Sequence, residues 1–352
     1  MFYKLFLLLY QILFVLMRPI FFPLLLLSLM CFYSCSTDFD INADKKDIAI
    51  VYGLLDQTDT VQYVKITRAF LCEGNALEMA RDPESGSYGD ELEVTVTQIH
   101  NGNETGTLTL QKTLVSGKDS GMFYYPQQEV YKFNFPNPAA VSNDSFRLRI
   151  NNIYTGNVVT ASTNMIHDFS ITKPLYNPDN PQLGLVGPSL EYSIFEASWK
   201  SAKNGRIYEP LFRFHYREVN NTTHDTVNKY VDWHLSRVKS EKLDGGEVLF
   251  TNYNSEEFYR NIAARVPVDY NVSRLIGKVD FIISAGGDEL SIYIDLNKPS
   301  TSVIQERPVY TNISNGLGIF SCRYTKKYSY NLTTFSKENL INGAYTSNLG
   351  FE

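Results

Sequence analysis

The chain has 352 residues and a formal net charge of −6 at pH 7, with 24 tyrosines and 22 phenylalanines. This acidic balance excludes the strongly basic surface that binding to nucleic-acid phosphates requires, so no nucleic-acid partner is expected. Removal of an apolar N-terminal leader would leave 318 residues (352 minus 34), a length that favours two domains over one.

The leader occupies residues 1–34 and ends immediately before Cys35. An apolar core that ends in a small residue and a cysteine resembles a bacterial lipoprotein signal, whose cysteine is lipidated after cleavage. Cys31 is a rival lipidation site, but Met30 before it is bulkier than Ser34. We therefore predict that residues 1–34 are a signal peptide and that Cys35 is the acylated first residue of the mature chain.

The alternative for the leader is an uncleaved transmembrane anchor, because the apolar run is long enough to span a bilayer. No cluster of Lys or Arg follows the run as a stop-transfer signal would require, and the next charge, Asp38, is acidic. Met17 and Arg18 followed by an apolar stretch already have the layout of a signal peptide. Processing is therefore favoured, and translation starts at Met1 or at Met17.

Residues 35–46 are polar and predict a tether between the membrane and the folded part. Several acyl chains on Cys35 would hold the protein stably, because each buried methylene contributes about 0.8 kcal/mol. Acidic residues soon after the cysteine are similar to the surface-export signal of Bacteroidota lipoproteins. We expect a lipid-anchored protein of the outer membrane that faces the periplasm or the cell exterior.

Short stretches of alternating polar and apolar residues in the segment 47–172 are typical of half-buried strands. Seven such strands separated by turn residues predict a mainly β chain whose N-terminal domain is a β-sandwich of Ig-like or transthyretin-like type. The predicted strands are 48–55, 61–70, 92–100, 107–114, 129–135, 146–153 and 158–163.

A proline-rich segment, 173–188, predicts a linker, because proline donates no hydrogen bond to a sheet. The segment 189–352 then predicts a second β-sandwich domain with one short helix near 255–266, where Asn254 and Glu257 resemble a capping box. The strands predicted in this domain are 190–199, 208–219, 230–239, 275–285 and 289–296.

No motif in the sequence identifies a catalytic centre, a metal ion or a cofactor. His224 stands beside an aspartate in a polar hairpin tip, which favours a solvated turn. His215 and His234 lie in predicted strands next to aromatic residues, where an imidazole usually has a structural hydrogen bond. Adjacent carboxylates such as Asp288-Glu289 are common on surfaces, and only geometry distinguishes them from glycosidase acids. We therefore predict a protein that is not an enzyme.

Two pairs of residues are candidates for covalent modification. Thr60 and Thr226 each lie in an Asp-Thr-Val triplet that resembles the O-glycosylation sites of the Bacteroidota. Cys72 and Cys322 are either free and buried or joined by a disulfide in an oxidising envelope.

Several segments resemble those of Bacteroidota lipoproteins that are commonly encoded beside TonB-dependent outer-membrane receptors: Tyr63–Arg68, Phe146–Ile150 with Gly156 and Thr160–Thr163, and Pro308–Phe320. The resemblance lies in strands and turns, so it carries over no catalytic residue. It implies a partner: a TonB-dependent receptor and its nutrient.

Three hypotheses for the function follow. The first is a non-catalytic, lipid-anchored protein whose exposed aromatic residues bind a ligand or a receptor during TonB-dependent nutrient uptake; the ligand is not identified. The second is a fimbrial or adhesin subunit of the two-sandwich type, whose C-terminal tail, 328–352, would be exchanged between subunits. A monomeric binder should instead pack Phe335, Leu340 and Leu349 into its own core. The third is an envelope hydrolase, which requires a cleft with two facing carboxylates.

Overall fold

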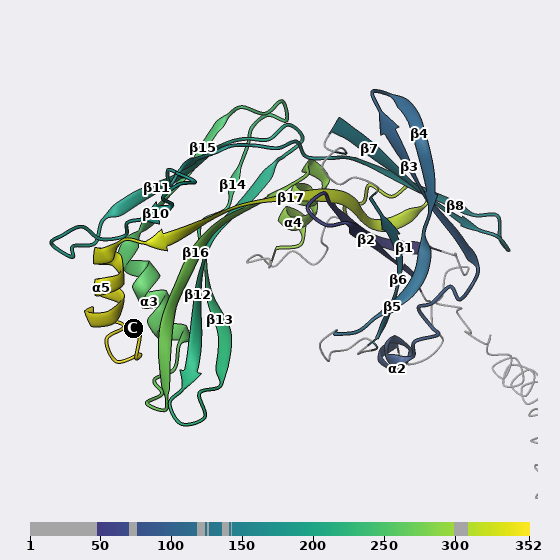
Figure 1. Ribbon diagram of the computed structural model, residues 1–352. Helices are drawn as coiled ribbons and strands as arrows, with labels where there is room; N and C mark the ends of the chain where they lie inside the picture. The colour runs from purple at the N-terminus through teal and green to yellow at the C-terminus, as the bar shows by residue number, and fades with distance from the viewer. Residues whose placement is uncertain are drawn as a thin grey trace, which may run out of the picture. The chain divides into compact units, whose positions relative to one another are not determined.

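The computed structural model describes residues 48–69, 76–117, 124, 127–135, 141, 143–298 and 309–352 (Figure 1). The chain is mainly β, as predicted, and its strands form three sheets within the described residues. The part from Lys46 to Glu352 is one compact unit.

The largest sheet has the strand order β13-β12-β16-β17-β1-β2-β6-β5. Two further short strands, β10 and β14, pair with β17 and β12. The strands of this sheet are β1 (Ala49–Asp56), β2 (Val61–Arg68), β5 (Gln111–Val115), β6 (Gln128–Asn134), β10 (Gln182–Leu183), β12 (Ile207–Asn220), β13 (Thr226–His234), β14 (Val238–Lys239), β16 (Val272–Gly286) and β17 (Gly316–Leu332).

The N-terminal sandwich is completed by a four-stranded sheet of order β4-β3-β7-β8. Inward-facing side chains of this sheet, such as Phe146 and Leu148, are fully buried in the same core as Val51 and Val64 from β1 and β2. The rings of Phe146 and Phe135 lie 5.1 Å apart between centroids. The four strands are β3 (Leu92–His100), β4 (Asn103–Thr109), β7 (Asp144–Asn152) and β8 (Val158–Asn164).

The C-terminal sandwich is completed by a three-stranded sheet of order β15-β11-β9. Aromatic rings form its interior: the ring centroids of Phe212 and Tyr253 are 5.1 Å apart, and those of Trp199 and Tyr208 are 5.8 Å apart. The three strands are β9 (Ile171–Lys173), β11 (Ile194–Lys200) and β15 (Val248–Asn254).

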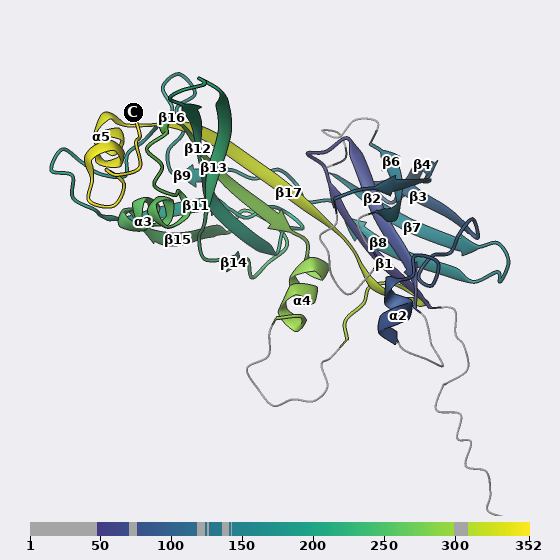
Figure 2. The same ribbon diagram turned by 90° about the horizontal axis from the view of Figure 1, so that it is seen from below.

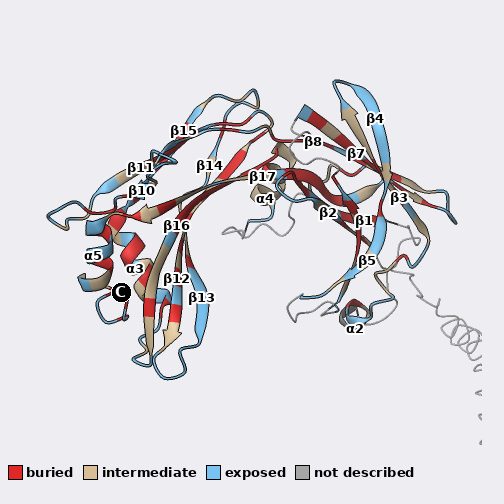
Figure 3. Ribbon diagram, viewed as in Figure 1, coloured by how far each residue is buried: buried red, intermediate tan, exposed pale blue. Residues whose placement is uncertain are grey.

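Strand β17 belongs to both sandwiches. Its first half, from Gly316 to Arg323, pairs in parallel with β1, and its second half, from Arg323 to Tyr330, pairs antiparallel with β16. Figure 3 shows buried residues along β17 and its neighbours. The two sandwiches predicted from the sequence are therefore joined by one continuous strand.

The segment 173–188, predicted to be a linker outside the sheets, pairs with a sheet at two places. Lys173 is the last residue of β9, which pairs with β11 of the C-terminal sandwich. The strand β10 pairs in parallel with β17 at Asn331 and Leu332. The prolines flank these short pairings and lie outside the strands, in keeping with their missing N–H groups.

Four helices lie in the described residues: α2 (Ala76–Arg81), α3 (Ser255–Arg265), α4 (Asp288–Leu296) and α5 (Thr334–Asn342). The helix predicted near 255–266 is confirmed as α3, and the Asn254 side chain accepts a hydrogen bond from the Glu256 N–H at 3.0 Å. The prediction of a single helix in the second half is wrong, because α4 and α5 follow it.

The strand predicted at 289–296 is the helix α4, which begins directly after β16 and lies beside β17 (Figure 2). Apolar residues at every second position fit a strand, but Leu290 and Ile294 are also neighbours on one helix turn. Asp288 and Glu289 in the first turn favour the helix, because negative charge is stabilised at a helix N-terminus.

Candidate binding surface

The histidines have structural roles where the structure describes their partners. His215 Nε2 lies 2.9 Å from the buried carboxylate of Asp280, which also accepts a hydrogen bond from Ser329. Burial raises the pKa of Asp280, but the hydrogen bonds from Ser329 and His215 and the charge of Lys327 outweigh burial and lower it. Since the Ser329 hydroxyl is bonded to the aspartate and not to the imidazole, this is not the hydrogen-bonded pair of a nucleophile and its base.

Two other predictions for histidines have different outcomes. His224 lies in an exposed turn with a φ of 60°, so the solvated-turn interpretation is confirmed. His234 Nδ1 is 3.9 Å from Glu209, too far for the predicted hydrogen bond. Within the described ranges, no group of three or more His, Cys, Asp or Glu side chains could hold a metal ion.

The predicted modification sites fall partly within the described chain. Thr60 and Thr226 are both exposed, so a glycosyltransferase could reach them, and their glycosylation stays a prediction. Cys322 is a free thiol, fully buried, with its Sγ 2.9 Å from the carbonyl oxygen of Asn164. The structure has Cys322 in the free and buried state; Cys72 lies outside the described residues, so a disulfide between the two stays a prediction.

Cys35 and the leader also lie outside the described residues. Among the helices that the structure describes, none combines the length and the apolar composition needed to cross a bilayer. The lipidation of Cys35 therefore stays a prediction.

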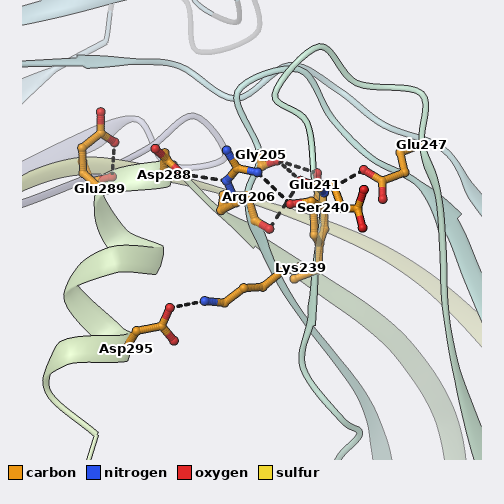
Figure 4. Close-up of polar contacts among 11 residues, drawn as sticks. Gly205, Arg206, Lys239, Ser240, Glu241, Glu247, Asp288, Glu289 and Asp295 are labelled. Atoms are coloured by element: carbon orange, nitrogen blue, oxygen red, sulfur yellow. Dashed lines mark hydrogen bonds and ion pairs between the residues drawn. The ribbon is translucent and has the colours of Figure 1, made fainter.

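The helix α4 is attached to the C-terminal sandwich by two ion pairs (Figure 4). Arg206, just before β12, places its Nε 2.7 Å from Asp288 Oδ1 at the first turn of α4 and donates from Nη1 to the carbonyl oxygen of Ser240 at 2.8 Å. Lys239 of β14 pairs with Asp295 near the end of α4. Both ends of the helix are thus fixed to the segments that flank β12.

The neighbouring carboxylates Asp288 and Glu289 have different environments. In Figure 4, Asp288 points toward Arg206, whereas Glu289 turns away from it. Glu289 accepts a hydrogen bond from the Ser321 hydroxyl of β17 at 3.1 Å. Burial raises the pKa of Glu289, and the charge of Asp288 adds to the rise. This pair does not have the facing arrangement that a glycosidase requires.

On its other side α4 meets the N-terminal sandwich through two tyrosines. The ring of Tyr293 packs edge-on against that of Tyr52 in β1, with 6.4 Å between centroids. Burial, and then the hydrogen bond with Tyr293, raise the pKa of Tyr52 to about 12, so its hydroxyl stays neutral. The helix therefore contacts elements of both sandwiches beside the strand that they share.

Tyr52 belongs to an outward-facing group of apolar side chains beside α4, which we call the tyrosine face and which consists of Tyr52, Leu54, Tyr63 and Leu317. Tyr52 pairs with Lys65 on β2. Ile50, whose side chain lies on the same side of β1 as that of Tyr52, pairs with Leu317 on β17. Tyr52 and Tyr63 keep 44% and 46% of their surface exposed.

The tyrosine face can offer the ring surfaces and the hydroxyl groups of Tyr52 and Tyr63 to a ligand. Aromatic rings with polar edges suit sugars and the side chains of peptides alike. The sequence predicts exposed aromatic contacts without naming them. The alternation of buried and exposed residues in β1 is the sequence signal for this face. Tyr52 and Leu54 are two residues apart, so their side chains lie on the same side of the strand.

Comparison with known proteins identifies no family. No family model and no curated protein matches the chain. One matching solved structure comprises the N-terminal four Ig domains of Dscam1 isoform 4.44, with 14% identity, a TM-score of 0.16 and coverage of 68% of this chain. The match spans 50% of that structure's chain. Similarity at this level does not bear on fold or function.

Proposed function

We propose that the protein is a non-catalytic, lipid-anchored protein of the outer membrane that binds a ligand or a partner receptor in TonB-dependent nutrient uptake. Cys35 would carry the anchor, and the tyrosine face would be the contact surface. The sequence features that support this proposal are the lipoprotein-like leader and the resemblance to lipoproteins encoded beside such receptors.

The observation that carries the proposal is the packing of the C-terminal tail. Leu340 and Leu349 are almost completely buried in the chain's own core, as the binder hypothesis predicted. Phe335 is the exception: it is 38% exposed on α5, so that part of the prediction is wrong.

Backbone hydrogen bonds also hold the last residues in place. The Arg274 N–H donates to the Gly350 carbonyl at 2.8 Å, and the Glu352 N–H donates to the Arg274 carbonyl at 2.9 Å. A fimbrial subunit of the type considered would need a tail that leaves its own domain. A tail held by both apolar packing and backbone pairing supports the self-contained binder instead.

The anchor is tested by labelling cells with a radioactive fatty acid. We expect label in the wild-type protein and none in Cys35→Ala. Label that persists in the variant would refute the assignment of the anchor to Cys35.

The partner is tested by co-purification with the TonB-dependent receptor encoded nearest to this protein. We expect the receptor to be recovered with the wild-type protein, and recovery to fall at least tenfold with the double variant Tyr52→Ala and Tyr63→Ala. Tyr270→Ala is the matched control, because Tyr270 is exposed in a loop outside the tyrosine face. Equal recovery with all three proteins would exclude the tyrosine face as the contact, and no recovery with the wild type would count against the uptake role.

A further inference from the structure

Among the described residues, the strand β15 ends the three-stranded sheet and has one side unpaired. It pairs with β11 alone among the described strands. The Ser255 N–H donates to the Ser193 carbonyl and the Ser201 N–H to the Glu247 carbonyl, so odd-numbered residues bond toward β11. Because bonding alternates along an antiparallel strand, the backbone N–H and C=O groups of Val248, Phe250 and Asn252 point to the open side.

The sequence of β15, Val-Leu-Phe-Thr-Asn-Tyr-Asn, has no charge, proline or glycine. Proteins usually protect open edges with charges, bulges or covering segments. Five other sheet-edge strands of the described chain have such protection, whereas the two-residue strand β10 carries no charge. Charged residues lie in β13, β5, β4 and β9, and the edge of β8 is covered by the segment around Ser314.

Two outward side chains on this open edge, Val248 and Phe250, are apolar, whereas Asn252 is polar. Val248 and Phe250 are 66% and 56% exposed, and Ile194 on the adjacent strand β11 is also exposed. Free backbone groups beside exposed apolar side chains are the arrangement to which an added strand binds.

We propose that a second copy of this chain pairs with β15 through its own β15, in an antiparallel arrangement related by a two-fold axis. This inference goes beyond the proposed function and does not depend on it. The occupant follows from charge: in a two-fold interface each residue approaches residues of the same strand, and a strand without charges meets no like-charge repulsion there. The same pairing centred on Lys229 of β13 or on Lys112 of β5 would bring two lysines together.

The open hydrogen-bonding groups restrict the register. Even-numbered residues must pair with even-numbered residues, and pairing Phe250 with Phe250 of the partner subunit covers both exposed rings. Val248 then lies opposite Asn252 of the partner subunit. Such an interface joins two three-stranded sheets into one and closes on itself, so it yields a dimer and not a fibre.

A cysteine scan on the full-length protein in its membrane tests this register. Directly opposed residues of a hydrogen-bonded antiparallel pair have Cα atoms about 5.5 Å apart, within the range of a disulfide. Under mild oxidation we expect Phe250→Cys to form a covalent dimer. Val248→Cys is the matched control, because its two copies would lie roughly 14 Å apart at about 3.4 Å per residue. Wild-type protein controls for the native cysteines. A covalent dimer of Val248→Cys but not of Phe250→Cys would overturn the register.

The mass of the detergent-solubilised protein, measured by light scattering, tests the dimer itself. We expect twice the mass of one chain for the wild type and a single-chain mass for Phe250→Lys, with unchanged tryptophan fluorescence as evidence of folding. Leu114→Lys places the same charge on an exposed position of β5 and should remain a dimer. A monomeric wild type, or a Phe250→Lys protein that remains dimeric, would overturn the proposal.

Discussion

Arg274 is the residue that ties the C-terminal tail to the second sandwich. Its guanidinium is almost completely buried, pairs with Glu218 at 3.0 Å and donates to the carbonyl oxygens of Leu349 and Pro267. Burial alone would raise the pKa of Glu218, but hydrogen bonds from Lys229 and Arg274 lower it. The arginine therefore neutralises a partly buried carboxylate and fixes the tail at the same time.

Replacement of Arg274 by methionine should lower the free energy of unfolding by about 1–3 kcal/mol, because the buried carbonyl oxygen of Leu349 loses its donor and Glu218 keeps only Lys229 as a partner. Urea denaturation followed by tryptophan fluorescence measures the loss. Arg260→Met is the control, because Arg260 and its partner Glu256 form an exposed pair on α3 and should contribute far less. Equal losses for the two variants would contradict the structural role of Arg274.

The raised pKa of Glu289 predicts that its contribution to stability decreases as the pH rises. Since burial raises its pKa in the folded state, the folded protein binds this proton more tightly than the unfolded chain. The resulting stabilisation is fully present below the unfolded pKa and is lost as the pH rises through the raised folded pKa. Glu289→Gln should remove this loss, so its stability relative to the wild type should increase from acidic to neutral pH.

Urea midpoints of both proteins across that pH range test the prediction for Glu289. Glu257→Gln, at an exposed position in the first turn of α3, should change little relative to the wild type over the same range. A constant difference between Glu289→Gln and the wild type at all pH values would show that Glu289 titrates alike in the folded and unfolded states.

At the scale of elements, the pairing of β17 with β1 depends on a glycine. Gly318 has a φ of 105°, and a Cβ at this position would lie 2.0 Å from the carbonyl oxygen of Val51 on β1. Gly318→Ala should therefore destabilise the fold by at least about 1–3 kcal/mol, the usual cost of one strained backbone position. Thermal unfolding measures the effect. Gly187→Ala, where no atom lies within 4 Å of the added carbon, should be close to neutral.

The helices show how far the sequence could predict the elements. α3 is predictable because its cap and its buried residues Phe258 and Ile262 give one consistent signal. α4 is not, because its apolar residues satisfy the strand period and the helix is stabilised by the distant partners Arg206 and Lys239. Tertiary contacts decide between two local patterns of similar strength.

The candidate surface shows the same limit. The alternation in β1 places Tyr52 and Leu54 on one side, but only pairing tells which side faces solvent. Tyr293 lies more than two hundred positions along the chain from Tyr52, and no local pattern brings them together. The sequence could thus predict that aromatic residues form the surface, but not which residues come together in it.

At the scale of the whole molecule, β17 makes the two sandwiches one compact unit, whereas the linker in the sequence favours two separate domains. The two halves of β17 meet at Arg323, which pairs with both β1 and β16, so the unfolding of one sandwich would leave the other with an unsupported strand end. We therefore expect one cooperative transition for the described part of the chain.

A core substitution in one sandwich, followed by a probe in the other, tests this cooperativity. Leu148 is fully buried in β7 of the N-terminal sandwich, so Leu148→Ala should cost about 2–5 kcal/mol. Both tryptophans, Trp199 and Trp233, lie in the C-terminal sandwich and report its unfolding. If β17 couples the sandwiches, the urea midpoint from tryptophan fluorescence should fall as far as that from far-UV circular dichroism. A fluorescence midpoint unchanged from the wild type would mean that the sandwiches unfold independently despite their common strand.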